Sequence, residues 1–267
     1  MKLGFVGAGK MAEAIIAAVL RSGWAKPEEI VASDKVDERL RVMSEAYKVR
    51  TTSDVREVLQ YSEVVILAVK PQDMDALLTG MAPQIGENHL LVSIAAGKTL
   101  DSLRAGLGRE CRLVRVMPNL AIQVGEGMSV YCCGNGALES DGECVAEIFG
   151  TAGRVVELKE ELFDAVTALS GSGPAFFAYT LEAMVLGAVA LGMAEETARV
   201  LAIQTMLGSA RVLCETGQNP VDFIKAVASP KGTTAAGLEI LEGSELQGII
   251  AATIGAAARR SGELSQS

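Results

Sequence analysis

Residues 2–21 read KLGFVGAGKMAEAIIAAVLR, and this stretch decides the fold. A short apolar run ends at Gly7, and a helical pattern of apolar residues begins near Gly9. In such a turn Gly7 permits a tight bend, Gly9 lets a pyrophosphate approach the backbone, and Ala12 keeps the helix close to the sheet. An ordinary turn between a strand and a helix has the same glycines. The position at the start of a strand–helix–strand unit favours a dinucleotide site.

Short apolar runs then alternate with amphipathic stretches, which is typical of βαβ units on a parallel sheet. The run VVILAV at residues 64–69 is nearly all apolar, as a strand covered on both faces requires. We therefore expect an α/β fold with a doubly wound parallel sheet. The expected strands are residues 2–6, 30–33, 64–69, 89–94 and 112–116, extended by 127–132 and 154–157, and the first two expected helices are residues 9–21 and 35–47.

The strand signals end at about residue 160, so we expect a dinucleotide-binding domain over residues 1–159 and an all-α domain over residues 160–267. Helix breaks are expected at 170–174, 192, 217–220 and 229–232. The helix expected at 175–191 is apolar on most of its circumference, and such a helix needs cover on nearly every side. We expect a second copy of the chain to provide it; a compact monomeric bundle is the alternative.

Composition excludes several classes of protein. The 267 residues include 24 Lys and Arg against 33 Asp and Glu, a formal net charge of −9, which argues against nucleic acid or an anionic membrane as partner. Five cysteines, with Cys132 next to Cys133, suit neither a disulfide framework nor a zinc site and indicate reduced thiols in a cytoplasmic protein. Residues 165–194 contain one charged residue, Glu182, but a break at 170–174 would prevent a membrane span.

The end of the second strand, Ser33-Asp34-Lys35, bears on the choice between NADH and NADPH. An acidic residue here accepts hydrogen bonds from the ribose hydroxyls, whereas a hydroxyl or cationic residue accommodates a 2′-phosphate. Asp34 therefore favours NADH, and Ser33 with Lys35 or Arg39 favours NADPH. If Asp34 instead caps the following helix, a phosphate is tolerated. The sequence leaves both cofactors open.

Two later turns extend the expected cofactor site. Lys70 and Pro71 close the strand at 64–69, at the sheet edge where ligands of open α/β sheets bind. Lys70 is placed to meet the cofactor, although a solvated loop lysine would occupy the same position. Residues 93–97, SIAAG, end the next strand with small side chains that leave room for a nicotinamide ring.

The helical half contains two glycine turns that each precede a helix, SGSGP at residues 170–174 and SPKGTT at residues 229–234, with the second helix expected from Ala235 to Leu241. Amides and hydroxyls at a helix amino terminus bind small anions such as a carboxylate. Ser and Thr also cap helices routinely, which is the alternative for either turn alone. Two such turns beside a dinucleotide fold favour a substrate site.

Few titratable groups are available for catalysis. The one histidine, His89, lies in a polar stretch ahead of a strand and is expected at the surface, and no Cys, His and Asp cluster indicates a metal. A protonated C=N bond accepts a hydride readily, so the protein need only orient the reactants and donate one hydrogen bond, for which a Thr hydroxyl suffices. The composition therefore fits reduction of an imine.

Six segments together resemble pyrroline-5-carboxylate reductases: GFVGAGKMAEAI, AVKPQ, VSIAAG, RVMPN, ALSGSGPAFF and NPVDFIKAVASPKGTTAAGLEILE. The resemblance runs from residue 3 to about residue 255, and the last segment is specific to that family. It implies an N-terminal Rossmann domain and a helical dimerisation domain that interlocks with its twin, with dimers that assemble into decamers. It also implies reduction of 1-pyrroline-5-carboxylate to L-proline by NADPH or NADH, the last step of proline biosynthesis.

The resemblance also implies site residues. Cofactor contacts are implied for Val6, Gly7, Ala8, Gly9, Lys10, Met11, Ser33, Ala68, Val69, Lys70, Pro71 and Ala96. Substrate contacts are implied for Glu160, Ser229, Gly232, Thr233 and Thr234. Thr234 is the implied catalytic residue, whose hydroxyl donates to the ring nitrogen.

Some positions depart from the family pattern, and two other functions are alternatives. Lys231 stands where the family usually has Gly, Ala226 replaces a commonly polar residue, Leu120-Ala121 replaces Thr-Pro, and Val55 falls where some relatives have Asn. β-Hydroxyacid dehydrogenases and related imine reductases share the order of elements, but they have a helical Lys four residues after the glycine turn, which this chain lacks. A non-catalytic dinucleotide-binding assembly protein is the other alternative, and the intact Thr234 argues against it.

Overall fold

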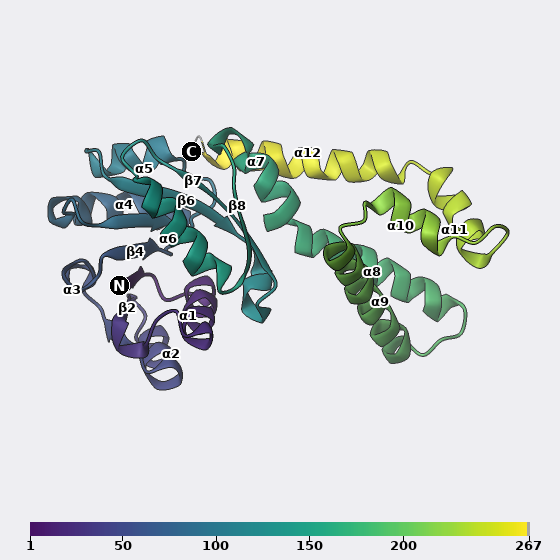
Figure 1. Cartoon of the computed structure of the whole chain (residues 1–267), viewed down its shortest axis with the longest axis horizontal. Helices are drawn as coiled ribbons and strands as arrows, with labels where there is room; N and C mark the ends of the chain where they lie inside the picture. The colour runs from purple at the N-terminus through teal and green to yellow at the C-terminus, as the bar shows by residue number, and fades with distance from the viewer. Residues whose placement is uncertain (266–267) are drawn as a thin grey trace. The chain divides into compact units, whose positions relative to one another are not determined.

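The computed structural model describes residues 1–265. Contacts divide them into two compact units, one made of residues 1–172 and 256–265 and the other of Gly173–Gly255. The first unit contains the sheet, and the second is helical (Figure 1). The domain boundary expected after residue 159 stays a prediction.

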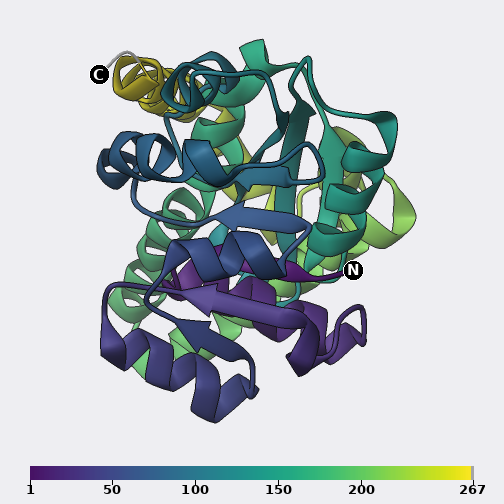
Figure 2. The same cartoon turned by 90° about the vertical axis from the view of Figure 1, so that its left-hand side faces the viewer.

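The first unit is built on one eight-stranded sheet in the order β3-β2-β1-β4-β5-β6-β7-β8 (Figure 2). Neighbouring strands from β3 to β6 are parallel, β7 is antiparallel to β6, and β8 is parallel to β7. The strands are β1 (Leu3–Val6), β2 (Ile30–Ser33), β3 (Arg50–Thr52), β4 (Val64–Leu67), β5 (Leu90–Ser93), β6 (Arg112–Pro118), β7 (Gly127–Cys133) and β8 (Gly153–Glu157). Strand order reverses between β1 and β4, which is the topological switch point of a doubly wound sheet.

Helices cover both faces of this sheet. They are α1 (Lys10–Ser22), α2 (Asp37–Tyr47), α3 (Val55–Tyr61), α4 (Pro71–Met81), α5 (Leu100–Leu107), α6 (Glu139–Gly150) and α7 (Phe163–Val166), with short 3₁₀ turns at Pro27–Glu29, Ala82–Gln84, Leu120–Val124 and Glu160–Leu162. Along β4, Val64 and Ile66 belong to one buried cluster, whereas Val65 and Leu67 belong to the cluster on the opposite face. The alternation explains why this strand is apolar at every position, because neither face reaches water.

The expected α/β fold is confirmed, and the expected strands and first two helices form with ends shifted by a few residues. The strand expected over residues 64–69 ends at Leu67, because the chain already turns there toward α4, which begins at Pro71 with Lys70 as its N-cap. The sequence did not predict β3, since Arg-Thr-Thr is a short polar run at the edge of the sheet, where only one neighbour pairs with it.

The second unit begins within a continuous helical stretch, and the break expected at 170–174 is wrong. Residues Thr167–Gly171 form a π-helical turn in which the Ser172 N–H donates to the Thr167 carbonyl at 2.8 Å. The wider turn absorbs the glycines, and Pro174 falls in the first turn of the next α-helical segment, where a missing N–H costs little. The helices that follow are α8 (Gly173–Ala190), α9 (Glu195–Thr216), α10 (Pro220–Val227), α11 (Thr233–Glu242) and α12 (Leu246–Ser265), and α12 ends in the first unit.

Much apolar surface of α8 and α9 is exposed in the single chain. Phe177 is 63% exposed, Tyr179 82%, and Leu191, in the turn between the two helices, 91%. Further exposed apolar residues on these helices are Met184, Leu186, Val200, Leu201, Ile203, Met206 and Leu207. Many exposed large apolar side chains on two helices in contact mark an interaction site. One helical stretch of the described chain, Glu160–Ala190, also has the length and composition to cross a membrane. A single stretch of this kind is weak evidence for a membrane span, because core helices of other proteins meet the same criteria.

Candidate active site

The turns that follow β1, β2, β4 and β5 meet at one edge of the sheet. The Gly7 N–H donates to the Ser33 carbonyl at 2.8 Å, the Ala68 N–H to the Val6 carbonyl at 2.8 Å, and the Ile94 N–H to the Leu67 carbonyl at 3.2 Å. These bonds continue the strand pairing into the turns. The residues expected to bind a cofactor are thereby brought together at the switch point, where open α/β sheets bind their ligands.

The two glycines of the first turn have different surroundings. Gly7 has φ +97°, and a Cβ there would lie 2.7 Å from the carbonyl carbon and oxygen of Ala68, so only glycine fits. A Cβ at Gly9 would have no atom within 4 Å. Gly9 precedes α1 as its N-cap, and no side chain caps that helix. The open backbone and the free amides at a helix amino terminus fit a pyrophosphate group.

A polar network that the sequence did not predict holds this turn. Asp34 accepts a hydrogen bond from the Ala8 N–H at 2.7 Å, and Arg39 Nε donates to the Ala8 carbonyl at 2.7 Å. Arg39 also pairs with Glu13 at 2.7 Å, and Tyr47 donates to the same carboxylate at 3.2 Å. Burial raises the pKa of Glu13, but hydrogen bonds from Arg39, Lys10 and Tyr47 outweigh it and leave this pKa below its usual value.

The other expected cofactor residues differ in exposure. Ser33 is buried, and its Oγ donates to the Phe5 carbonyl at 3.2 Å. Lys70 is exposed at the N-cap of α4, with Pro71 in the first turn. Ala96 is exposed in the loop before α5, and the next residue, Gly97 at φ +75°, lies against Leu264 near the end of α12. Lys10 projects into solvent and pairs with Glu13 at 3.3 Å, and Met11 lies in the first turn of α1.

The expected substrate residues Ser229, Gly232, Thr233 and Thr234 lie together in the second unit, at the start of α11. The helix begins at Thr233, two residues before the expected start, and Gly232 is its N-cap without a side-chain hydrogen bond. The Thr234 hydroxyl does not cap the helix, and it makes no hydrogen bond within residues 1–265. Lys231 precedes the helix in the left-handed region at φ 59°, a conformation that disfavours side chains other than Asn, Asp and Gly.

Glu160, the remaining expected substrate residue, is bound by groups of the first unit. Its carboxylate accepts hydrogen bonds from the Leu100 N–H at 2.7 Å and from Arg115 at 2.8 Å, and the Arg115 guanidinium lies 4.6 Å from the centre of the Phe163 ring. Arg115 is 3% exposed, so Glu160 neutralises a buried charge. A contact between Glu160 and substrate stays a prediction.

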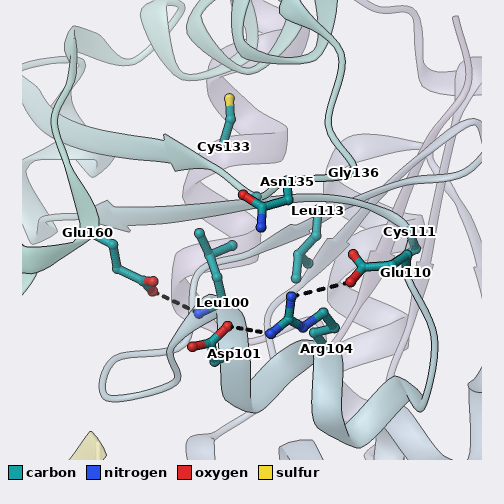
Figure 3. Close-up of a pocket in the computed structure, with 11 residues that line it drawn as sticks. Leu100, Asp101, Arg104, Glu110, Cys111, Leu113, Cys133, Asn135, Gly136 and Glu160 are labelled. Atoms are coloured by element: carbon teal, nitrogen blue, oxygen red, sulfur yellow. Dashed lines mark hydrogen bonds and ion pairs between the residues drawn. The ribbon is translucent and has the colours of Figure 1, made fainter.

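A cavity in the first unit includes Glu160 on its wall (Figure 3). Its charged residues are paired: Arg104 donates to Asp101 at 2.8 Å and to Glu110 at 3.2 Å. The other lining residues are Leu100, Cys111, Leu113, Cys133, Gly134, Asn135 and Gly136. None of the expected cofactor residues lines this cavity, and each of its charged side chains is engaged in an ion pair.

The histidine and the cysteines of the chain are in environments that do not favour a catalytic role. His89 lies at the amino end of β5, where its Nδ1 accepts from the Gly86 N–H and its Nε2 lies 2.8 Å from the Leu59 carbonyl, so both ring nitrogens are used. Burial raises the pKa of Cys132 to about 12 and of Cys144 to about 11, which keeps both thiols protonated at neutral pH. All five cysteines are free, and no group of His, Cys, Asp or Glu in the described chain could hold a metal ion.

Two family descriptions match parts of the sequence. Residues 160–264 match the family described as pyrroline-5-carboxylate reductase dimerisation. Residues 2–97 match the family described as NADP oxidoreductase, coenzyme F420-dependent. The two matches fall on the helical region and on the first five strands, respectively.

Relatives match over the whole length. The pyrroline-5-carboxylate reductase of Arabidopsis thaliana is 43% identical over all of this chain and 96% of its own, and that of Methanosarcina acetivorans is 40% identical over 98% and 97%. The solved reductase of Coxiella burnetii superposes with a TM-score of 0.95 at 32% identity, covering 100% of this chain and 99% of its own. The Plasmodium falciparum reductase, solved with NADP bound, gives 0.88 at 28% identity over 99% and 98%. On these matches and on the geometry above, the chain belongs to the pyrroline-5-carboxylate reductase family.

Proposed function

We propose that this protein reduces the C=N bond of 1-pyrroline-5-carboxylate with NADPH or NADH to give L-proline. The observation that supports this best is the full-length similarity to reductases of that name, together with an intact glycine turn and an unpartnered Thr234 hydroxyl. Proline biosynthesis in the cytoplasm is the corresponding role, supported by five free thiols. The net charge of −9 argues against a nucleic-acid or anionic-membrane partner.

The residues of the first unit would bind and orient the cofactor, which supplies a hydride when bound. The free amides at the start of α1 would hold the pyrophosphate beside Gly9. Lys70 and Ala96, in the turns after β4 and β5, would contact its other groups. Because the turns are tied to the sheet by hydrogen bonds, their main-chain groups are already ordered before the ligand binds.

The residues at the start of α11 would bind the substrate. The amides at this helix terminus suit its carboxylate, and the Thr234 hydroxyl would donate to the ring nitrogen. In the protonated imine the ring nitrogen has no lone pair. As the carbon of the C=N bond accepts the hydride, the π electrons become the lone pair of the amine nitrogen, and the Thr234 hydroxyl would donate to that lone pair as it forms. No protein acid is needed. The enzyme's task is to orient the two reactants.

An assay of NADH and NADPH oxidation with 1-pyrroline-5-carboxylate tests this function, with L-proline identified by mass spectrometry. Stoichiometric proline is the expected product. Oxidation of a β-hydroxy acid with no imine reduction would point to the dehydrogenase alternative. Cofactor binding without turnover of any of these compounds would point to an assembly protein and contradict the proposal.

We further propose that the protein is a homodimer through α8 and α9, and that dimers assemble further, up to a decamer. The exposed apolar residues of these helices support binding to another apolar surface. The match to a dimerisation family supports a second copy of the chain as the partner. Glu160, Ser229, Gly232 and Thr233 are proposed as substrate contacts on the family resemblance.

Replacing Val200 by arginine in the full chain is expected to shift the equilibrium from dimer to monomer, as measured by analytical ultracentrifugation. Val200 is 63% exposed on α9, and an arginine there would be desolvated without a partner when the interface forms. Leu138→Arg is the matched control, because Leu138 is 55% exposed at the N-cap of α6 in the first unit. A wild-type chain that sediments as a monomer at micromolar concentration would contradict the dimer.

A further inference from the structure

We propose that Asp34 makes the cofactor site of this chain selective for NADH over NADPH. The inference rests on the proposed function, since it concerns the same site, but it is tested by binding as well as by turnover. The relative from Plasmodium falciparum was solved with NADP, so the fold itself accepts a 2′-phosphate. The selectivity is therefore attributed to side chains of this chain alone.

The Asp34 carboxylate turns toward the glycine turn. One oxygen accepts from the Ala8 N–H at 2.7 Å, and the other accepts from the Val36 N–H at 2.9 Å. The N-cap of α2 is Val36, and no side chain caps that helix. The carboxylate is thus not used as a helix cap, the arrangement that would have moved it away from the ligand.

This position is where the fold places the ribose of the adenosine. Asp34 follows β2 directly, and in this fold an acidic residue at the end of the second strand accepts hydrogen bonds from the ribose hydroxyls. The two N–H bonds fix the carboxylate, so it cannot swing away without losing both. A 2′-phosphate would bring its negative charge next to a fixed carboxylate, a repulsion that NADH does not meet.

The groups that could bind a 2′-phosphate are already occupied. The Ser33 Oγ is buried and donates to the Phe5 carbonyl at 3.2 Å. Arg39 uses Nε on the Ala8 carbonyl and pairs with Glu13, both at 2.7 Å, so a phosphate would have to compete with a neighbouring carboxylate for this cation. Two carboxylates, Asp34 and Glu13, therefore lie beside this arginine, and the second cation that pairs with Glu13, Lys10 at 3.3 Å, projects into solvent.

Lys35 is the remaining cation near the end of β2. It is exposed, and its side chain makes no hydrogen bond or ion pair within residues 1–265. A flexible, solvated lysine gains little from a single exposed ion pair. We therefore expect Lys35 to reduce the repulsion only slightly, and this expectation is tested directly below.

The test measures the dissociation constants of NADH and NADPH by calorimetry on wild type, Asp34→Asn and Asp34→Ser. Wild type is expected to bind NADH at least about tenfold more tightly, the order of effect of one charge contact in a partly exposed site. Asn keeps one acceptor for the turn but loses the charge, so the NADPH-to-NADH ratio of dissociation constants should fall about tenfold. ADP-ribose and its 2′-phosphorylated form should give the same ratios, because the nicotinamide is not involved.

Two further variants separate Asp34 from its surroundings. Asp37→Asn removes the same charge from the exposed first turn of α2 and should leave the ratio within about twofold of wild type. Lys35→Gln should also leave it nearly unchanged. A wild-type preference for NADPH, or a ratio that Lys35→Gln changes and Asp34→Asn does not, would overturn the proposal.

Failure of this inference can be distinguished from failure of the proposed function. If both cofactors bind equally and 1-pyrroline-5-carboxylate is still reduced, the selectivity is wrong and the function stands. If NADH binds selectively and no imine is reduced, the selectivity stands and the function is wrong. Thermal unfolding of each variant without ligand shows whether Asp34→Ser has loosened the turn, and Asp34→Asn then decides the outcome.

Discussion

Thr234→Ala is expected to lower kcat for 1-pyrroline-5-carboxylate about a hundredfold while leaving the affinity for NAD(P)H within twofold of wild type. Removal of one well-placed hydrogen-bond donor to a reacting group has an effect of this order. Cofactor affinity should persist because the expected cofactor residues belong to the other unit. Steady-state kinetics and calorimetric titration of the cofactor measure the two quantities.

The structure predicts that this substitution removes the hydroxyl without disturbing the fold. Thr234 lies in the first turn of α11, where the N-cap is Gly232, and alanine is the strongest helix former. The fold should therefore keep its unfolding temperature, so that lost activity reports chemistry. Thr234→Ser retains a hydroxyl and should recover most of the turnover, whereas Thr233→Ala should have a smaller effect. Wild-type turnover by Thr234→Ala would remove this hydroxyl from the mechanism.

Gly7→Ala is expected to destabilise the first unit by about 3 kcal/mol, which corresponds to a fall of roughly 10 °C in unfolding temperature. Part of the cost is the left-handed backbone at φ +97°, which an alanine adopts with difficulty. The larger part is the collision of its Cβ with the carbonyl of Ala68, a residue that is held to β1 by the hydrogen bond from its own N–H to the Val6 carbonyl. Differential scanning calorimetry without ligand measures the loss.

Gly9→Ala is the matched control for this effect. A Cβ at Gly9 meets no atom within 4 Å, and its φ of −70° is ordinary for alanine. The unfolding temperature should therefore stay close to wild type, but cofactor affinity should fall at least about tenfold if a pyrophosphate lies against this backbone. Equal stability losses in the two variants would contradict the packing argument, and unchanged cofactor affinity in Gly9→Ala would place the ligand elsewhere.

The sheet could be predicted from the sequence because each strand is marked by the pattern of apolar residues within its own short segment. β4 is buried on both faces, and its four consecutive apolar residues state this directly. The turn at Gly7 could be predicted because one conformation there admits glycine alone. By contrast, the π turn at Thr167–Gly171 depends on a hydrogen-bond pattern that glycine and proline content do not specify, and a break was the natural expectation.

The polar network around Ala8 could not be predicted for a different reason. Asp34 and Arg39 reach the glycine turn across 26 and 31 residues of sequence, and periodicity contains no information on such contacts. The same limit applies to Glu160, whose partner Arg115 lies 45 residues away on β6. Sequence alone placed Asp34 at the end of its strand but left the direction of its carboxylate undecided.

The contact between Gly97 and Leu264 has a practical consequence for handling the protein. A Cβ on Gly97 would lie 3.3 Å from the Leu264 main chain, so the last turn of α12 adjoins the loop that contains Ala96. A bulky label attached to the last turn of α12 would therefore stand close to a loop expected to touch the nicotinamide. β1 starts at Leu3, at the opposite edge of the sheet from the ligand turns, so a label at that edge is the better choice for immobilisation.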